Sequence, residues 1–258
     1  MNFPPDNLFK EYFDRVFVLS VPRFKERQQT VAEKLKGIPF EFFFGCDKQQ
    51  LTESFKEEQY HYDPSLSLSI TQSFPSLNEG EIACAISHRM IYEAMVKNGW
   101  KHVLIFEDDV LPVEKNIPQL ESVFRELPVD WDLLYLGYLK NEKSTPSNRL
   151  KNRWYRIQAA LGLTRMKASM IAHILPKPFS AHLQTSGFHD CTHAYAISLN
   201  GAAKLIAAQT PVSYRADNLL SALVLKNQLN AFATRDQLFE QEIFTDTAHK
   251  SHVREKKD

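Results

Sequence analysis

Short apolar runs alternate along the chain with longer stretches in which apolar residues recur at helical spacing. Continuous apolar runs of about four residues are typical of strands buried on both faces of a sheet. Such runs occupy residues 16–19, 40–44, 103–106, 133–136 and 194–197, and a last short strand is expected around Phe232. Helical patterns cover residues 23–36, 79–98, 116–127, 198–209 and 218–228. The alternation of strand and helix predicts an α/β fold with a mainly parallel sheet flanked by helices.

The composition is that of an ordinary globular protein. Of 258 residues, 43% are hydrophobic and 24% are charged, which argues against disorder, collagen and coiled coil. Lys and Arg number 31, as do Asp and Glu, so we expect no nucleic-acid partner for the chain as a whole. No apolar run reaches the ~18 residues of a spanning helix, and residues 1–15 lack the apolar core of a signal peptide. We therefore expect a cytoplasmic protein.

The three cysteines, Cys46, Cys84 and Cys191, lie far apart in the sequence. An odd and scattered set is typical of reduced thiols rather than of disulfides or a zinc site. This pattern also favours a reducing compartment.

One segment departs from the neutral balance of the chain. Residues 143–189 contain eight Lys or Arg and no Asp or Glu. Within it, four apolar and three basic residues recur at helical spacing: Leu150, Trp154, Ile157, Leu161, Arg149, Arg153 and Arg156. A basic amphipathic helix predicts peripheral contact with an anionic membrane, here the inner face of the cytoplasmic membrane. The alternative is an ordinary core helix whose cations are solvated.

The sharpest chemical feature is the sequence VLIFEDDV at residues 103–110. A buried strand runs directly into Glu107, Asp108 and Asp109, and ligands bind beyond the carboxyl ends of parallel strands. Neighbouring carboxylates repel unless cations or donors compensate them, and hard divalent metals prefer carboxylate oxygens. The motif thus predicts a metal and phosphate site; the alternative is an acidic turn with a helix cap. Extended alternation would point Glu107 and Asp109 to one side and Asp108 to the other.

Ser87 and His88 lie in the helix predicted over residues 79–98. A serine beside a histidine suggests a nucleophile and its base, but adjacent helical residues do not face each other. A buried, hydrogen-bonded His88 is the more common outcome for this pattern.

Six blocks of the sequence together carry a family resemblance. They are VFVLSVPRFKER at 16–27, GEIACAISH at 80–88, IFEDDV at 105–110, DWDLLYLG at 130–137, THAYAISLNGAAKL at 192–205 and YRADNLL at 214–220. The chain resembles glycosyltransferase family 25, which includes bacterial lipooligosaccharide β-galactosyltransferases and the collagen galactosyltransferases. It departs from the family at Ala83, which replaces a glycine, and at Pro211-Val212, which is displaced from the family's Pro-Val-Asp block. We identify no family motif in residues 140–189.

The resemblance implies a GT-A type, Rossmann-like fold in a single domain over residues 1–258. Residues 1–138 would form mainly the nucleotide-sugar-binding half. Residues 139–258 would form the acceptor-binding half, with the basic helical segment 143–189. The resemblance further implies a nucleotide-sugar donor and inversion at the anomeric carbon, with Mn²⁺ or Mg²⁺ as cofactor.

Residue roles follow from the same resemblance. Asp109 would bind the metal directly, and Glu107 would assist through the ribose or a metal-bound water. Apart from the resemblance, His249 or His252 in the polar tail is a candidate third ligand; the alternative is a solvated tail. Asp108 would orient the sugar or serve the structure. The donor-binding residues would be Ser20, Arg23, Arg27, Glu81, Ser87, His88, Glu107 and Asp108. For the two arginines, the alternative is a solvated helix face.

Inversion in one displacement requires a general base for the acceptor hydroxyl. Asp217 matches the family block and is the first candidate, and Asp190 is the second; alternatively, Asp217 caps the helix over 218–228. The implied reaction moves galactose from UDP-galactose onto a glycolipid or oligosaccharide acceptor of lipopolysaccharide or lipooligosaccharide. The alternatives are another metal-dependent nucleotide-sugar or phosphoryl-transfer enzyme, and a non-catalytic sugar-binding domain.

Overall fold

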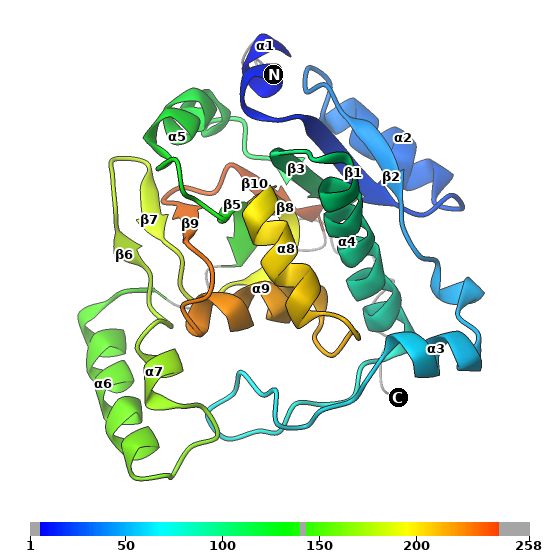
Figure 1. The fold of residues 1–258 in the computed structure, drawn as a ribbon. Helices are drawn as coiled ribbons and strands as arrows, with labels where there is room; N and C mark the ends of the chain where they lie inside the picture. Colours follow the sequence, from blue (N-terminus) through cyan, green and yellow to red (C-terminus); the bar gives the residue numbers. More distant parts are fainter. Residues whose placement is uncertain (1–5, 140–142, 243–258) are drawn as a thin grey trace.

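The computed structural model describes residues 6–139 and 143–242, which have the expected α/β architecture (Figure 1). The strands are β1 Arg15–Ser20, β2 Glu41–Phe44, β3 His102–Glu107, β4 Val110–Pro112, β5 Leu133–Leu139, β6 Lys177–Pro178, β7 Leu183–Thr185, β8 Asp190–Ser198, β9 Ala231–Thr234 and β10 Phe239–Gln241. The α-helices are α1 Asp6–Tyr12, α2 Lys25–Lys34, α3 Glu53–Gln59, α4 Glu79–Asn98, α5 Leu120–Glu126, α6 Pro146–Ala160, α7 Ala168–Ile171, α8 Leu199–Ala208 and α9 Ala216–Leu225. Two short 3₁₀ helices are η1 Lys48–Gln50 and η2 Ile117–Gln119.

The central sheet of the described chain has eight strands in the order β2-β1-β3-β8-β5-β9-β7-β6. β1 pairs in parallel with β2 and β3, and β5 pairs in parallel with β9. β8 runs antiparallel to both of its neighbours, and β7 runs antiparallel to β9 and β6. All strands of this sheet except β8 and β7 therefore share one direction. The reversal of β8 places its first residue, Asp190, opposite the last residue of β5, Leu139.

Helices cover both faces of the sheet. On one face α1, α2 and α5 pack against alternate strand residues, among them Val18 and Phe106. On the other face α4, α8 and α9, which lie in front of the sheet in Figure 1, pack against the intervening residues, among them Ile105 and Tyr195. These four side chains are fully buried. Burial on both faces explains why the strands are continuous apolar runs rather than alternating ones.

The helix α4 has the bounds that the sequence predicts. Its first turn is closed by a capping box, in which Asn78 accepts from the backbone N–H of Glu81 at 3.0 Å and Glu81 accepts from that of Asn78 at 2.9 Å. Gly99 ends the helix with a φ of 67°, a conformation that favours glycine. The capping box and Gly99 therefore fix the residues at which α4 begins and ends.

Other boundaries differ from the prediction. The helix expected over 116–127 divides into η2 and α5, and the strands β4, β6, β7 and β10 are too short to leave a pattern in the sequence. The helix α9 begins at Ala216 with Arg215 as its N-cap, so Asp217 lies inside the first turn. The alternative in which Asp217 caps this helix is therefore wrong.

The basic helix forms as α6 and lies beside α7, at the lower left of Figure 1 and away from the sheet. None of its side chains is buried. The alternative of an ordinary core helix is therefore wrong. Among the described residues, no helix has the length and apolar character needed to cross a bilayer.

Candidate active site

A cavity of about 780 Å³ opens at one edge of the sheet. It lies where β1 and β3 end and β8 begins, and the first turns of α4 and α9 form part of its wall. Ligand sites of α/β sheets lie at such edges. The charged side chains that line it are Arg23, Glu26, Arg27, Asp47, Lys48, Glu81, Glu107, Asp108, Asp109, Asp190, Arg215, Asp217 and Glu242.

The acidic triplet divides at the end of β3. Strand geometry stops at Glu107 and a turn follows, so the predicted alternation does not hold. Asp108 and Asp109 both meet the Arg27 guanidinium, with oxygens 2.5 Å and 3.2 Å from its Nη2, whereas Glu107 turns toward α4. The expectation that Glu107 and Asp109 share one side is wrong because the chain leaves the extended conformation there.

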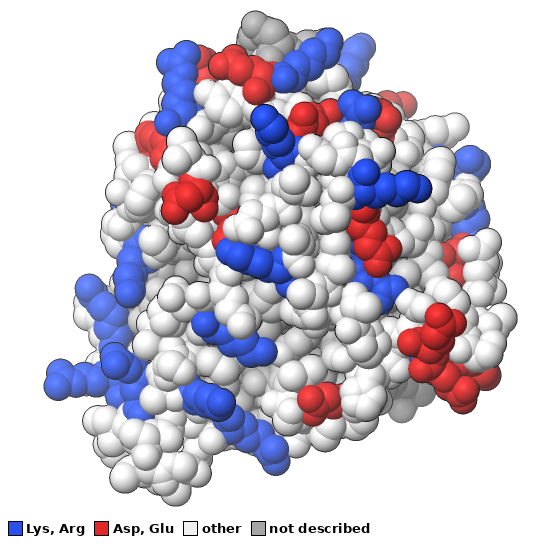
Figure 2. All heavy atoms as spheres, viewed as in Figure 1, with Lys and Arg blue, Asp and Glu red and all other residues white. Residues whose placement is uncertain are grey.

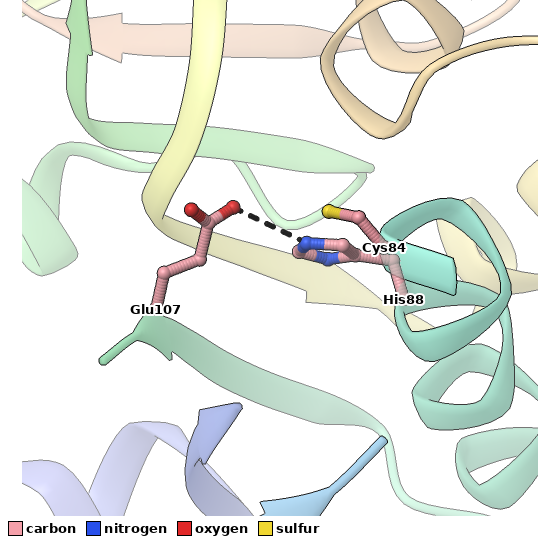
Figure 3. A group of neighbouring side chains, drawn as sticks. All are labelled: Cys84, His88 and Glu107. Atoms are coloured by element: carbon pink, nitrogen blue, oxygen red, sulfur yellow. Dashed lines mark hydrogen bonds and ion pairs between the residues drawn. The ribbon is translucent and has the colours of Figure 1, made fainter. Parts of the chain in front are cut away.

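Glu107 lies at one end of a chain of hydrogen bonds, and Figure 3 shows its first link, to His88. His88 Nε2 lies 3.3 Å from the Glu107 carboxylate, and its Nδ1 lies 2.7 Å from the Tyr195 hydroxyl, which is 2.7 Å from that of Tyr92. Because a carboxylate only accepts, Nε2 donates, and the Nδ1 of a neutral ring then accepts from Tyr195. Thr192 also donates to Glu107. Although burial opposes ionisation, His88 and Thr192 hold the pKa of Glu107 below its ordinary value.

Cys84, His88 and Glu107 offer ligand atoms that lie within 4.8 Å of one another. Cys84 and His88 project from one face of α4 toward the end of β3 (Figure 3). However, His88 and Glu107 already bond to each other, and burial raises the pKa of the Cys84 thiol well above its ordinary value. We interpret the group as a support that positions Glu107.

Asp109 is the carboxylate best placed for a divalent cation. Its Oδ2 accepts from Gln241 at 3.0 Å and pairs with Arg27, but its Oδ1 is buried without a hydrogen-bond partner among the described residues. Burial and the charge of Glu107 raise its pKa to about 7, against the attraction of Arg27. A partnerless carboxylate oxygen beside further carboxylates suits the oxygen ligands that Mg²⁺ and Mn²⁺ prefer. The residues present therefore fit the expected metal.

Both predicted arginines line this cavity; Arg27 is half-buried there, and Arg23 is exposed at its rim. Arg27 binds Asp108 and Asp109, and Arg23 pairs with Asp47 at 2.6 Å. Asp108 also accepts a 2.6 Å hydrogen bond from Ser20. Asp47 had no signal in the sequence because it lies in a polar loop after β2, and only the fold brings it to Arg23.

The two candidate bases are Asp190, the first residue of β8, and Asp217, in the first turn of α9. Asp190 and Asp217 both line the cavity. The backbone N–H of Cys191 donates to Asp217 Oδ2 at 3.4 Å, and that of Asn218 donates to Oδ1 at 2.8 Å. The antiparallel direction of β8 brings Asp190 to this edge, which the sequence did not indicate.

The remaining predicted residues have mainly positioning contacts. Glu81 closes the capping box of α4 and pairs with Arg215 at 2.7 Å, which ties α4 to the start of α9. Ser87 donates to the carbonyl of Ala83 and accepts from the backbone N–H of Cys46. His88 is not among the described residues that line the cavity. His249 and His252 lie outside the described residues.

Several lining residues escaped the sequence analysis. Gln241 lies in a segment without a distinctive pattern, whereas Arg215 and Thr192 lie inside family blocks that assign them no role of their own. The three cysteines, far apart in the sequence, all line this one cavity, and none of them forms a disulfide. Their convergence depends on the order of the strands, which no local signal records.

Comparisons with known proteins agree with the motifs. A family model described as glycosyltransferase family 25 (LPS biosynthesis protein) matches residues 13–220. The chain belongs to glycosyltransferase family 25. The matched range of this family 25 domain includes both arginines, the acidic triplet and the two candidate bases, and all of these residues line the cavity.

Individual relatives cover the domain but are much longer. The mouse (Mus musculus) inactive glycosyltransferase 25 family member 3 is 27% identical over 80% of this chain and 31% of its own length. The Drosophila melanogaster glycosyltransferase 25 family member is 28% identical over 76% of this chain and 28% of its own. Human (Homo sapiens) procollagen galactosyltransferase 2 is 23% identical over 76% and 28%. The family 25 domain thus spans under a third of these relatives.

Proposed function

We propose that this family 25 domain is an inverting, metal-dependent glycosyltransferase that moves a hexose from a UDP-sugar to a saccharide hydroxyl. One observation carries the proposal: Arg27, Asp109, Asp190 and Asp217 come from separate elements and line one cavity. Cationic and metal-binding groups therefore stand within reach of carboxylates that can accept a proton, as a single displacement requires.

The donor diphosphate fits the side of the cavity at β1, β3 and α2. Arg27 Nη2 bridges the carboxylates of Asp108 and Asp109, which offsets their mutual repulsion and leaves the remaining guanidinium donors for phosphate oxygens. Asp109 would hold Mn²⁺ or Mg²⁺ through its partnerless Oδ1. When bound, such a metal neutralises the charge that develops on the departing diphosphate.

The acceptor fits the side of the cavity at β8 and α9. Asp217 is held by two backbone N–H groups, which fix the carboxylate and leave oxygen lone pairs to accept the acceptor's proton. Asp190, at the start of β8, is the second candidate for the same role. Glu107, fixed by His88 and Thr192, keeps its charge and its orientation between the two sides.

We further propose galactose as the transferred sugar and a glycolipid or oligosaccharide of the lipopolysaccharide class as the acceptor. The support is the family model's description as an LPS biosynthesis protein and the printed name of the procollagen galactosyltransferase relative. The name of the mouse relative, inactive family member 3, keeps a non-catalytic sugar-binding domain as the second candidate function. A glycosyltransferase would cleave the UDP-sugar, whereas a non-catalytic domain would only bind it.

The test is cleavage of UDP-galactose, UDP-glucose and UDP-N-acetylglucosamine with Mn²⁺. UDP release is measured both without an acceptor, when the sugar is transferred to water, and with an added saccharide as acceptor. UDP release that EDTA and Asp109→Asn abolish, and that the exposed control Asp130→Asn preserves, supports the proposal. Release of UMP would instead indicate phosphoryl-transfer chemistry. Binding of the UDP-sugar without any release would indicate a non-catalytic domain.

A further inference from the structure

The side of the molecule formed by α6 carries an apolar stripe that no described segment covers. Leu150, Trp154, Ile157 and Leu161 are 71%, 58%, 48% and 68% exposed. At 3.6 residues per turn, these four positions fall within about 60° of one another around the helix. Leu163, directly after the helix, is also 69% exposed. Isolated exposed apolar residues need no explanation, but a continuous stripe marks an interaction site.

The stripe faces away from the protein because a different stripe of α6 makes the internal contacts. Tyr155 and Ala159 pack against the small core around Met166 and Ile171. Asn152 donates a 2.7 Å hydrogen bond to the carbonyl of Ile171. Positions 152, 155 and 159 lie opposite 150, 154 and 157 around the helix. The packed stripe thus fixes the outward direction of the apolar one.

Cations flank the exposed stripe. Arg149, Arg153 and Arg156 form an exposed row about 90° to one side of it, and Lys151 lies on the other side. Residues 143–189 contain no Asp or Glu. Figure 2 shows Lys and Arg gathered on the part of the surface where α6 and α7 lie in Figure 1. The apolar stripe therefore lies between two positively charged edges, and residues 143–189 contribute no acidic side chain to this surface.

We propose that α6 docks this domain onto an anionic lipid bilayer, lying parallel to the surface. Apolar side chains would enter the acyl boundary, Trp154 would lie at the headgroup level, and the arginines would meet lipid phosphates. A protein partner is less well matched, because protein interfaces are depleted in charge at their centre and carry mixed polar rims. The inference does not depend on the transfer reaction.

The first test is co-sedimentation with vesicles of phosphatidylcholine alone or mixed with phosphatidylglycerol, at low and high salt. Wild-type protein should bind the anionic vesicles, and high salt should weaken the binding. Changing Arg149, Arg153 and Arg156 to Ser should lower the partition coefficient by roughly 100-fold. A matched triple variant of exposed lysines on other elements, Lys36, Lys97 and Lys115 to Ser, should bind much like wild type. Binding that ignores lipid charge, or that both triple variants lose equally, overturns the proposal.

The second test asks which residue enters the bilayer. Brominated lipids should quench the fluorescence of Trp154, and Trp154→Phe should keep vesicle binding while losing that quenching, since Trp100 and Trp131 remain. Leu150→Ser with Ile157→Ser should weaken binding even at low salt. Unquenched Trp154 in vesicle-bound protein overturns the proposal. So does a dimer in solution that Leu150→Ser dissolves, because the stripe would then join two copies of the chain.

Discussion

Replacing Asp109 by Asn should make the metal-free protein more stable at neutral pH, although it removes the expected metal ligand. The reason is the cost of ionising a buried carboxyl whose Oδ1 has no partner. Burial and the charge of Glu107 raise the pKa of Asp109 from an ordinary 3.8 to about 7. Asn resembles the protonated carboxyl and avoids that cost.

The size and the sign of the effect follow from linkage between protonation and folding. A raised pKa means that the folded protein binds the proton more tightly than the unfolded chain, so stability falls as the pH rises from about 4 to 7 and is constant above. The difference between the two pKa values corresponds to roughly 4 kcal/mol at pH 8 and to roughly 1–2 kcal/mol at pH 5. The attraction of Arg27, 3.2 Å away, is already contained in the raised value.

The assay is denaturant unfolding of wild type and Asp109→Asn at pH 5 and pH 8, with EDTA present. The stability advantage of the variant should grow between the two pH values by roughly 3 kcal/mol, and its Tm at pH 8 should rise by several degrees. Added Mn²⁺ should then stabilise wild type and leave the variant unchanged. Equal stability of the two proteins at pH 8, or an advantage that does not vary with pH, would refute the reasoning.

Three other outcomes are expected. Glu126→Gln should destabilise the protein by about 2 kcal/mol at pH 7, because hydrogen bonds, including that from His182, outweigh burial and lower the pKa of Glu126 to about 2. The full shift corresponds to roughly 3 kcal/mol, and solvent around this carboxylate reduces it. The difference should vanish as the pH falls from about 4.5 to 2 in equilibrium unfolding. Asp217→Asn should lower transfer by roughly 10²–10⁴-fold with unchanged donor affinity by calorimetry, and a loss of donor binding instead would contradict its role. Gly45→Ala should cost about 1–3 kcal/mol of stability, since the added Cβ would collide with the Ser87 side chain; an unchanged Tm would contradict the packing described.

The sequence by itself determined the elements and their class. The buried strands β1, β3 and β5 were predicted because each is a continuous apolar run, and the helical spacing of apolar residues over 79–98 placed α4, whose ends the structure shows closed by a capping box and by Gly99. The acidic triplet led to the prediction of a metal and phosphate site, because three carboxylates directly follow a buried strand. The family block at 214–220 added the candidate base Asp217, with Asp190 as the second candidate; no periodicity marks either residue.

Only the tertiary structure decided how these pieces meet. Asp47 pairs with Arg23, Gln241 reaches Asp109, and Thr192 holds Glu107, all across long sequence separations. Such contacts depend on strand order and on the reversal of β8, which arise from the packing of the whole sheet. The outward stripe of α6 was likewise undecided, because an amphipathic pattern fixes which residues share a face but not what lies against that face. Local spacing is a property of the chain, whereas burial is a property of the assembled fold.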